Sequence, residues 1–579
     1  MTYLPELAAI NSPAKKQIIS FEGYNVQPVI EDGEMRDMLN LSSEKYPNLS
    51  QRQARGFFTV GGIAPIYPDP EHILVKNGAL AVICKDAIQT FNGPARFFYG
   101  YEKNGDNWSP VPYPDVKVQE LSEGQRHMMV SIGKRICIWP EKIWFNVETK
   151  ESGTLYGNYE MLQAGSIVIK NDTTTSCTMT LPEGADLSGF TTNDAIELYF
   201  TDTNQTVYTT SSTIKEIRDN VMVLPADTFL SILPDFPGTE EEYTFSGTVL
   251  IERYVPDLDF VMESGNRLWG CHDNAICCCK LGDPTNWHYY QGLSVDAYEV
   301  EVGTDGPWTG CVPYSTHLLF FKENYIHKVF GNTPATYQTQ QSECYGLEKG
   351  SEKSVCVING TVFYKSKIGI MAYGGTLPEH ISANLGSKYY CNAIAGSDGA
   401  KYYVNMETRD GSREQLVFDL DRVLWHKEDD MQPIEYVYLT NDTYNEEGKN
   451  QLLYLRRAQS DDDINRICSV SPYVPFADEE KGLRWMAELG PFDEFIEDKK
   501  IYSKLKMRLK LDDDAEITVL VKFNDGEWQK IRHIYQSDER SAYIPISPIR
   551  CDKFFVRLEG VRECTVESLV REYRERSDR

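Results

Sequence analysis

Short apolar runs rich in Val, Ile, Tyr, Phe and Thr recur along the chain, with Gly, Asn, Asp and Pro between them. Runs of this kind are typical of β-strands joined by turns. Helical periodicity is scarce. The clearest case lies in residues 565–576, where four apolar residues follow helical spacing: Val566, Leu569, Val570 and Tyr573. The pattern predicts an all-β fold that ends in a short helix.

A loose repeat of two strands and a polar turn runs through much of the chain, with clear copies in 318–331 and 362–373. Successive copies after residue 267 are roughly 40 to 50 residues apart, which is the length of a four-stranded propeller blade. One hairpin cannot bury both of its apolar faces by itself. When blades stack radially, each blade covers the apolar faces of its neighbours. We therefore predict a β-propeller, with its first blades in 57–149 and the remaining blades in 251–485.

Three other regions depart from this repeat. Residues 150–250 are rich in Thr, Ser and Asp. We predict a small β-barrel or sandwich inserted there between blades, because insertions are tolerated at loop tips. Residues 1–56 have turn chemistry but no sustained period, which favours an extended N-terminal arm packed on the body or on a neighbouring subunit. Residues 486–579 alternate strictly in places, as in 501–511 and 517–523, and predict an antiparallel β-sandwich closed by the terminal helix.

The alternation in 501–511 places four basic residues on one face of a strand: Lys504, Lys506, Arg508 and Lys510. We call these four residues the basic stripe. They could contact DNA phosphates, but on an acidic molecule an acidic neighbour is the better partner. The basic stripe is therefore a candidate subunit contact.

The charge and composition exclude several classes of protein. The chain carries 58 Lys and Arg against 86 Asp and Glu, a net charge of −28, and so lacks the basic footprint of a dedicated nucleic-acid binder. A hydrophobic fraction of 41% with 12% aromatic residues is too high for a disordered chain. No apolar run reaches the length of about 18 residues that spans a bilayer, and the first residues lack the pattern of a secretory signal.

The cysteines do not form a recognisable metal or disulfide pattern. None of the 14 cysteines belongs to a C-x-x-C pair. Cys277, Cys278 and Cys279 are consecutive, and alternate strand residues point to opposite faces, which disfavours four convergent metal ligands. We expect free thiols that act as small hydrophobic residues, in a chain made in a reducing cytosol.

No motif predicts catalysis, and we expect neither an enzyme nor a bound cofactor or metal. A G-x-S-x-G elbow, a P-loop and a strand-linked G-x-G-x-x-G are all missing from the sequence. Acidic runs at 428–430, 461–463 and 512–514 are interpreted as solvated turns. His426 is expected to pack between blades. The aromatic cluster at 287–290 could stack on sugars, although burial is the better interpretation.

Several motifs spread over most of the chain carry a resemblance to a known family. They are Glu34-Met35-Arg36-Asp37, Asn40-Leu41-Ser42-Ser43, Tyr46-Pro47, Asp259-Phe260-Val261, Asn266-Arg267-Leu268-Trp269-Gly270, Leu281-Gly282-Asp283-Pro284 with Asn286-Trp287, Phe320-Phe321-Lys322-Glu323, and Trp425-His426-Lys427-Glu428-Asp429-Asp430. With them, the order of arm, interrupted propeller and sandwich resembles the tail nozzle (tail hub, or packaged-DNA stabilisation) proteins of tailed bacteriophages. The resemblance is closest to relatives from phages of Gram-positive gut bacteria.

The resemblance implies a structural virion protein with no catalytic residues to carry over. Such a protein is assembled in the host bacterial cytoplasm as a homo-oligomeric ring, for which we expect a hexamer. The ring would lie below the portal and head–tail adaptor, contact other tail proteins and retain packaged DNA until ejection. Double-stranded DNA would pass through it without specific binding, so we expect a channel wall that is net negative. The alternative is a receptor- or carbohydrate-binding tail propeller, or one that cleaves glycans.

Overall fold

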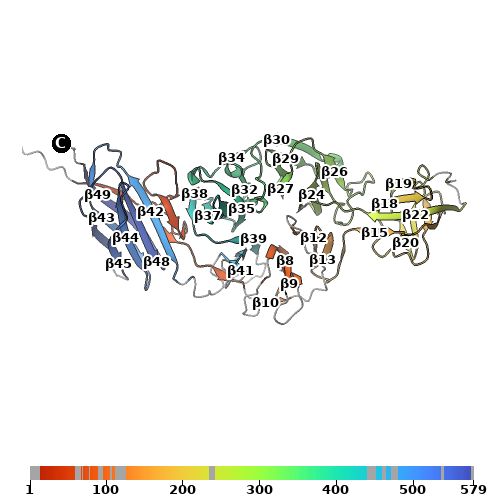
Figure 1. Cartoon of the computed structure of the whole chain (residues 1–579), viewed down its shortest axis with the longest axis horizontal. Helices are drawn as coiled ribbons and strands as arrows, with labels where there is room; N and C mark the ends of the chain where they lie inside the picture. Colours follow the sequence, from red (N-terminus) through yellow and green to blue (C-terminus); the bar gives the residue numbers. More distant parts are fainter. Residues whose placement is uncertain are drawn as a thin grey trace, which may run out of the picture. The chain divides into compact units, whose positions relative to one another are not determined.

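The computed structural model (Figure 1) forms two compact units, one made of residues up to 67 with those from 350 onward, the other of 68–349. The structure describes residues 13–58, 67, 70–76, 79–88, 96–104, 107–110, 126–233, 236, 241–439, 451–458, 465–470, 480, 482–535 and 540–575. The acidic run 461–463 lies outside these ranges. In the described part, the elements are 49 strands and three short 3₁₀ helices, Pro334–Thr336, Glu352–Ser354 and Ala383–Leu385. The prediction of an all-β chain is confirmed.

Seven four-stranded antiparallel sheets among the described residues have the meander of propeller blades. Four belong to the unit of residues 68–349. They consist of β7 (Pro70–Lys76), β8 (Ala79–Ile88), β9 (Arg96–Asn104) and β10 (Asn107–Pro110); β11 (Met128–Ile132), β12 (Arg135–Trp139), β13 (Ile143–Asn146) and β14 (Ser152–Thr154); β23 (Phe260–Ser264), β24 (Arg267–His272), β25 (Ala275–Cys278) and β26 (Tyr298–Glu301); and β27 (Trp308–Pro313), β28 (Leu318–Lys322), β29 (Tyr325–Phe330) and β30 (Gln338–Glu343). Their first strands contact one another in series, β7 with β11, β11 with β23 and β23 with β27.

The other three blade-like sheets belong to the second unit. They consist of β31 (Cys356–Ile358), β32 (Thr361–Ser366), β33 (Gly369–Tyr373) and β34 (Pro378–His380); β35 (Tyr390–Ser397), β36 (Lys401–Thr408), β37 (Arg413–Asp419) and β38 (Leu424–Lys427); and β39 (Pro433–Leu439), β40 (Gln451–Arg456) and β41 (Arg466–Ser469) with β6 (Gly56–Phe57). The first strands again contact in series. The fourth strand of the last sheet, β6, comes from the N-terminal segment and pairs with β41.

The consecutive cysteines show how these sheets are buried. Cys277 and Cys279 pack in a core with Trp139 of the preceding sheet. Cys278 packs in the opposite direction, in a core with Phe320 of the following sheet. Both faces of such a sheet are covered by neighbouring sheets, so its strands have continuous buried runs in place of strict alternation. Burial also raises the pKa of Cys278 to about 12, and the thiols act as small hydrophobic groups.

The inserted region forms one eight-stranded sheet around its own core (Figure 1). Its strands are β15 (Gly157–Glu160), β16 (Gly165–Asn171), β17 (Ser176–Thr180), β18 (Ala195–Asp202), β19 (Val207–Thr213), β20 (Glu216–Arg218), β21 (Val221–Pro225) and β22 (Tyr243–Arg253). The long strand β22 pairs with β15, β16 and β18. Phe200 lies at the centre of the core, edge-on to Phe229 and Phe245. Alternating buried positions along β16, β17, β18 and β22 supply further core residues.

The C-terminal region is a β-sandwich with one shared core, antiparallel except for the short parallel pair of residues 23–24 with residues 34–35. One sheet contains β4 (Leu41–Ser42), β5 (Leu49–Gln51), β49 (Cys564–Glu575), β43 (Lys500–Leu511) and β46 (Ser541–Pro545), with β1 (Ala14–Ile18) and β47 (Arg550–Cys551) at its margins. The other contains β2 (Gly23–Tyr24), β3 (Glu34–Leu39), β42 (Arg484–Phe492), β48 (Phe554–Val561), β44 (Glu516–Phe523) and β45 (Gln529–Ile534). As predicted from the alternation, Leu505, Met507 and Leu509 of β43 are buried and the basic stripe lies on the other face.

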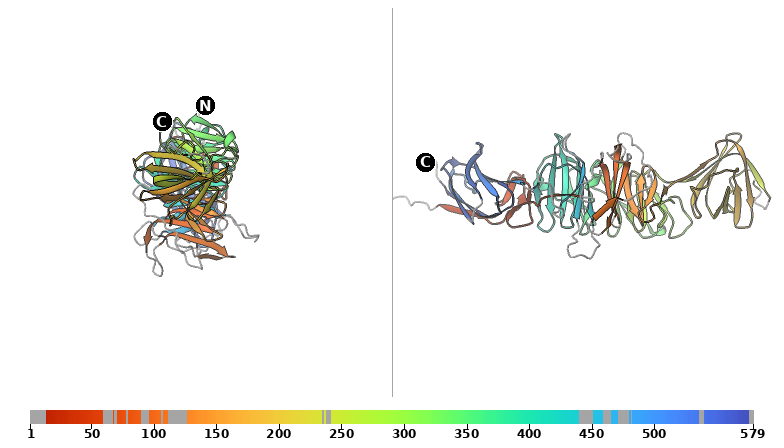
Figure 2. Two further views of the ribbon diagram at one scale, coloured as in Figure 1. Left: turned by 90° about the vertical axis from the view of Figure 1, so that its right-hand side faces the viewer. Right: turned by 90° about the horizontal axis from the view of Figure 1, so that it is seen from below.

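The N-terminal segment differs from the predicted irregular arm. In its described part, β1 pairs with β49, and β3 pairs with β42. Figure 2 shows these red strands beside the blue C-terminal ones. The strands are only two to six residues long, and their partners lie more than 400 residues away, so no local period reveals them. Gly23 also lies against the blade-like sheets, at a positive φ of 86° and so close to the Trp425 carbonyl that a Cβ would clash.

The predicted terminal helix is wrong, because residues 564–575 form strand β49. The register with β43 shifts between the pairs Leu509–Val566 and Arg508–Ser568, which makes Glu567 the extra residue of a β-bulge. The bulge changes the phase of the alternation, so that Val566 before it and Leu569 after it both enter the core. A bulged strand therefore has the three-and-four spacing of a helix.

Candidate functional sites

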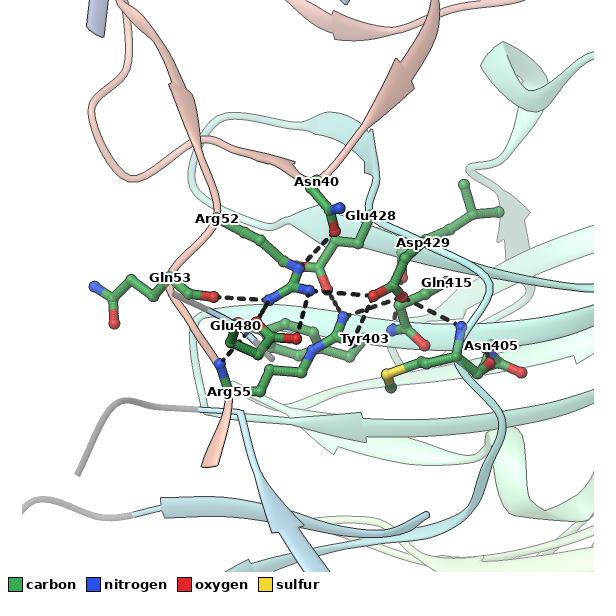
Figure 3. A network of polar contacts seen from close by, with 12 residues as sticks. Asn40, Arg52, Gln53, Arg55, Tyr403, Asn405, Gln415, Glu428, Asp429 and Glu480 are labelled. Atoms are coloured by element: carbon green, nitrogen blue, oxygen red, sulfur yellow. Dashed lines mark hydrogen bonds and ion pairs between the residues drawn. The ribbon is translucent and has the colours of Figure 1, made fainter. Parts of the chain in front are cut away.

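A cluster of buried charges ties the N-terminal segment to the blade-like sheets of the same unit (Figure 3). We call Arg52, Arg55, Glu428, Asp429 and Glu480 the ion cluster. Arg52 and Arg55 precede β6, and both arginine side chains are buried, with exposed fractions of 4% and 8%. The cluster forms because β6 brings the segment before it alongside the turn that follows β38.

Every charged group of the ion cluster has a partner within it. Arg55 donates from Nη2 to Glu428 at 2.6 Å and from Nη1 to Asp429 at 2.7 Å. Arg52 donates to Asp429 at 3.2 Å and, through two nitrogens, to Glu480 at 2.8 and 3.1 Å. Arg52 Nε also donates to the Asn40 side chain at 2.8 Å. Bidentate contacts of this kind fix geometry as well as charge, so the ion cluster acts as a structural lock.

The electrostatics of the ion cluster follow from burial opposed by pairing. Burial alone would raise the pKa of the Asp429 carboxyl, but Arg55 and Arg52 hold it below its usual value. Burial would also raise the pKa of Glu480, but its hydrogen bonds and charge interaction with Arg52 outweigh burial and lower that pKa below its usual value. Burial would lower the pKa of Arg55, whereas Asp429 raises it well above normal. The acidic run at 428–430 is thus not the solvated turn predicted from the sequence, since only Asp430 is exposed.

We expect the folded state to lose stability in acid through these carboxylates. Their ordinary pKa values are 3.8 for Asp429 and 4.5 for Glu480, and both are lower in the folded chain. The stabilisation is complete above the ordinary values and decreases as pH falls below them, because the unfolded chain then binds protons that the folded chain resists. Urea unfolding at a series of pH values measures this loss. An Asp429→Asn variant should show a shallower decrease below about pH 4, and an identical slope would contradict the assignment.

The loop of residues 282–287, which we call the motif loop, anchors the inserted sheet on its neighbouring blade-like sheet. The sequence Asn266-Arg267-Leu268-Trp269-Gly270, followed by the Gly-Asp-Pro-x-Asn-Trp of this loop, is the most specific part of the resemblance. Asn286 is buried, accepts a hydrogen bond from the backbone of Ala195 at 2.7 Å, and donates to Asp194 at 3.2 Å and to Asp283 at 2.6 Å. Asp194 in turn pairs with the buried Arg253 at the end of β22. The motif therefore specifies a junction between two parts of the fold and holds no reactive group.

The aromatic cluster that follows this motif is mostly buried. Trp287 lies edge-on to Trp139 at 6.3 Å, and Tyr289 is also buried, whereas Tyr290 is about half exposed. His426 is buried, as expected, and burial lowers its pKa to about 3. These side chains contribute mainly to packing.

One charged group was not detected in the sequence. The ring nitrogens of His127 lie 2.7 Å from Glu71 and 2.9 Å from Glu141. Burial would lower the pKa of His127, but the two carboxylates raise it to about 9. Glu71 and Glu141 are 70 residues apart and belong to different sheets, so no spacing in the sequence relates them. Across the described ranges, no group of three or more His, Cys, Asp or Glu side chains could hold a metal ion.

The structure places the basic stripe on the outer face of β43 and pairs half of it within the same sheet. Lys504 lies 3.3 Å from Glu572, and Lys510 lies 3.4 Å from Glu567. The Lys506 ammonium lies over the ring of Tyr543, 5.1 Å from its centroid, and that tyrosine is 61% exposed. Arg508 is exposed beside them. Lys506, Arg508 and Tyr543 form a patch with both charge and an aromatic surface.

A polar cleft of about 800 Å³ lies in the unit of residues 68–349. Three segments form its walls. They are the β12–β13–β14 meander, the loop 188–191 of the inserted sheet, and residues 282–285 together with Asn266. Its charged lining residues are Lys134, Arg135, Arg253 and Asp283. The loop 282–287 supplies part of the lining, but nothing in the sequence relates it to Arg135 or to the loop 188–191, because these segments meet only in the folded chain.

Comparisons with known proteins add little. No family model matches the chain, and no curated protein matches its sequence. Among solved structures, an exo-β-1,3-galactanase from Phanerochaete chrysosporium is 9% identical over 90% of this chain and 100% of that chain, with a TM-score of 0.21. A putative 6-phosphogluconolactonase from Bacteroides uniformis is 11% identical over 51% and 89%, with a TM-score of 0.24. Hsv2 from Kluyveromyces lactis is 10% identical over 59% and 95%, with a TM-score of 0.23. Identities and scores this low assign neither a fold family nor an activity.

Within the described residues, no helix is long and apolar enough to cross a membrane.

Proposed function

We propose that this protein is a structural component of a tailed bacteriophage virion, forming a ring in the tail that continues or closes the DNA channel below the portal and adaptor. The observation that carries the proposal is the motif loop. The residues with the most specific resemblance to tail nozzle proteins are those that hold the inserted sheet on a blade-like sheet. The N-terminal segment, interrupted blade-like sheets and C-terminal sandwich also follow the order that the resemblance implies.

The patch of Lys506, Arg508 and Tyr543 is the proposed subunit contact. Within the basic stripe, Lys504 and Lys510 pair with Glu572 and Glu567. Lys506 and Arg508 are the other two residues of the stripe. The chain has a net charge of −28, so a neighbouring copy offers abundant acidic partners. Tyrosine and arginine are both enriched in the centre of protein interfaces.

The excess of acid also suits the proposed channel. Each Lys or Arg on the channel wall would neutralise a phosphate and hold the duplex in a salt-dependent way. A negative wall repels DNA within a Debye length of about 8 Å at physiological salt, which lets the duplex slide. The proposed partners are other copies of the chain, the head–tail adaptor and further tail proteins.

We expect the purified chain to form rings with a central channel, visible by negative-stain microscopy and as a single oligomer by mass photometry. Replacing Lys506 and Arg508 together with Glu should abolish the rings and leave the thermal unfolding of the subunit unchanged. The matched control changes Lys530 and Arg532 to Glu, two exposed positions on β45 of the opposite sheet.

Three outcomes would contradict parts of this proposal. A monomer or trimer at all concentrations would oppose the ring, and rings of the Lys506 and Arg508 variant would oppose the contact. Tight binding of the ring to duplex DNA at about 50 mM salt would indicate a protein that grips DNA. A monomer or trimer that binds glycans would favour the second candidate, a receptor- or carbohydrate-binding tail protein, for which the polar cleft is the supporting observation.

A further inference from the structure

We infer that the polar cleft binds an acidic saccharide, with its carboxylate or phosphate held by Arg135 and its hydroxyls by the polar rim. This inference concerns the cleft alone and does not depend on ring formation. Its volume of about 800 Å³ falls within the range of small-molecule sites, roughly 300–1,000 Å³, and accommodates a short oligosaccharide.

The cations of the cleft are held in place before any ligand binds. The Arg135 guanidinium lies over the Trp144 ring, 4.5 Å from its centroid. The Arg253 side chain is only 5% exposed. Its Nε donates to the Leu155 carbonyl at 3.2 Å, and its Nη1 pairs with Asp194. A preorganised guanidinium loses little conformational entropy on binding and matches a carboxylate or phosphate with two parallel hydrogen bonds.

The acidic residues around the cleft already accept hydrogen bonds or form ion pairs within the protein. Asp283 is the lining carboxylate, and it accepts hydrogen bonds from Thr285 through one oxygen and from Asn286 through the other. Glu148 pairs with Lys134 at the rim. Of the three lining cations, Lys134 and Arg253 are thus paired with Glu148 and Asp194, whereas Arg135 contacts the Trp144 ring. Among the described residues, Arg135 has no carboxylate partner, and its guanidinium favours an anionic group over a neutral or cationic one.

The remaining lining consists of hydroxyl and amide side chains that suit a polyhydroxylated ligand: Asn146, Thr154, Ser188, Thr191, Asn266 and Thr285. They come from all three walls of the cleft. A free inorganic anion would use Arg135 alone, whereas a saccharide would also contact this rim. The rim therefore favours an anionic group carried on a sugar.

Isothermal titration calorimetry of the full chain tests the inference with three probes: a galacturonate trimer, the neutral galactose trimer and inorganic phosphate. We expect the acidic trimer to bind in the cleft, the neutral trimer to bind at least about tenfold more weakly, and higher salt to weaken the acidic trimer's binding. Arg135→Gln should reduce the affinity for the acidic trimer at least about tenfold. Lys134→Gln, at an exposed rim position, should reduce it severalfold without affecting folding.

Arg218→Gln is the matched control. Arg218 is an exposed arginine of the inserted sheet that pairs with Glu216 and does not line the cleft. Failure of the acidic trimer to bind, equal affinity for both trimers, or unchanged binding by both cleft variants would overturn the inference. Phosphate that binds as tightly as the acidic trimer would overturn the saccharide assignment. Ring formation by the Arg135→Gln variant is scored separately by microscopy. The ring tests the proposed tail function and the calorimetry tests saccharide binding, so failure of one proposal can be told from failure of the other.

Discussion

A chain that begins at residue 59 is expected not to fold its C-terminal sandwich. The deletion removes β1 and β5, which pair with β49, and β3, which pairs with β42. It also removes β2 and β4, which pair with β3 and β5, and takes β6 from the last blade-like sheet. The buried apolar side chains that are lost include six from the sandwich core: Ile18, Phe21, Met35, Met38, Leu41 and Leu49. Each such side chain contributes about 1.5–3 kcal/mol, and together they approach the whole stability of a typical domain, about 5–15 kcal/mol.

Limited proteolysis and near-ultraviolet circular dichroism measure this loss. We expect rapid cleavage within 484–575 and loss of the aromatic signal, with partial recovery when a peptide of residues 13–58 is added. The control is Val29→Ser in the intact chain, since Val29 is 77% exposed and the substitution should leave unfolding unchanged. If the truncated chain melted like the full chain, the segment would be dispensable and the strand pairing would contribute no stability.

An Arg55→Met variant is expected to lose about 3–5 kcal/mol of unfolding free energy, because it leaves the buried carboxylate of Glu428 without its arginine and Asp429 with Arg52 alone. Methionine retains the length and apolar stem of the arginine, so the effect reports the charge. The orphaned carboxylates can be neutralised by protons, and the loss should therefore be smaller at pH 4 than at pH 7.

Urea unfolding of the variant and parent at both pH values provides the measurement. Arg562→Met is the control, because Arg562 pairs with Asp514 at the surface and such exposed pairs contribute about 0–1 kcal/mol. Adding Asp429→Asn to the Arg55→Met variant should recover part of the loss at pH 7. A loss below about 1 kcal/mol that does not change with pH would show that the ion cluster behaves like a surface pair.

The polar cleft shows how far sequence reasoning reached at the candidate site. The motif loop 282–287 was recognised, and the structure shows it as the junction that brings the cleft walls together. Arg135 and Arg253, however, lie on ordinary strand positions 118 residues apart, without a motif around either. The hydrogen bonds of Asn286 with Asp194 and of Arg253 with Leu155 help to bring them to one cavity, and such long-range contacts leave no local period.

The sequence by itself determined the all-β class, the blade-like meanders and the two-faced strand β43, because strand periodicity and turn residues are local properties. The tertiary structure alone decided the rest. The N-terminal segment became strands because their partners β42 and β49 lie at the other end of the chain. The last residues became a strand because they pair with β43, and the bulge at Glu567 gives that strand its helix-like spacing. The acidic turn at Glu428 and Asp429 became a buried lock because Arg52 and Arg55, more than 370 residues away, neutralise it.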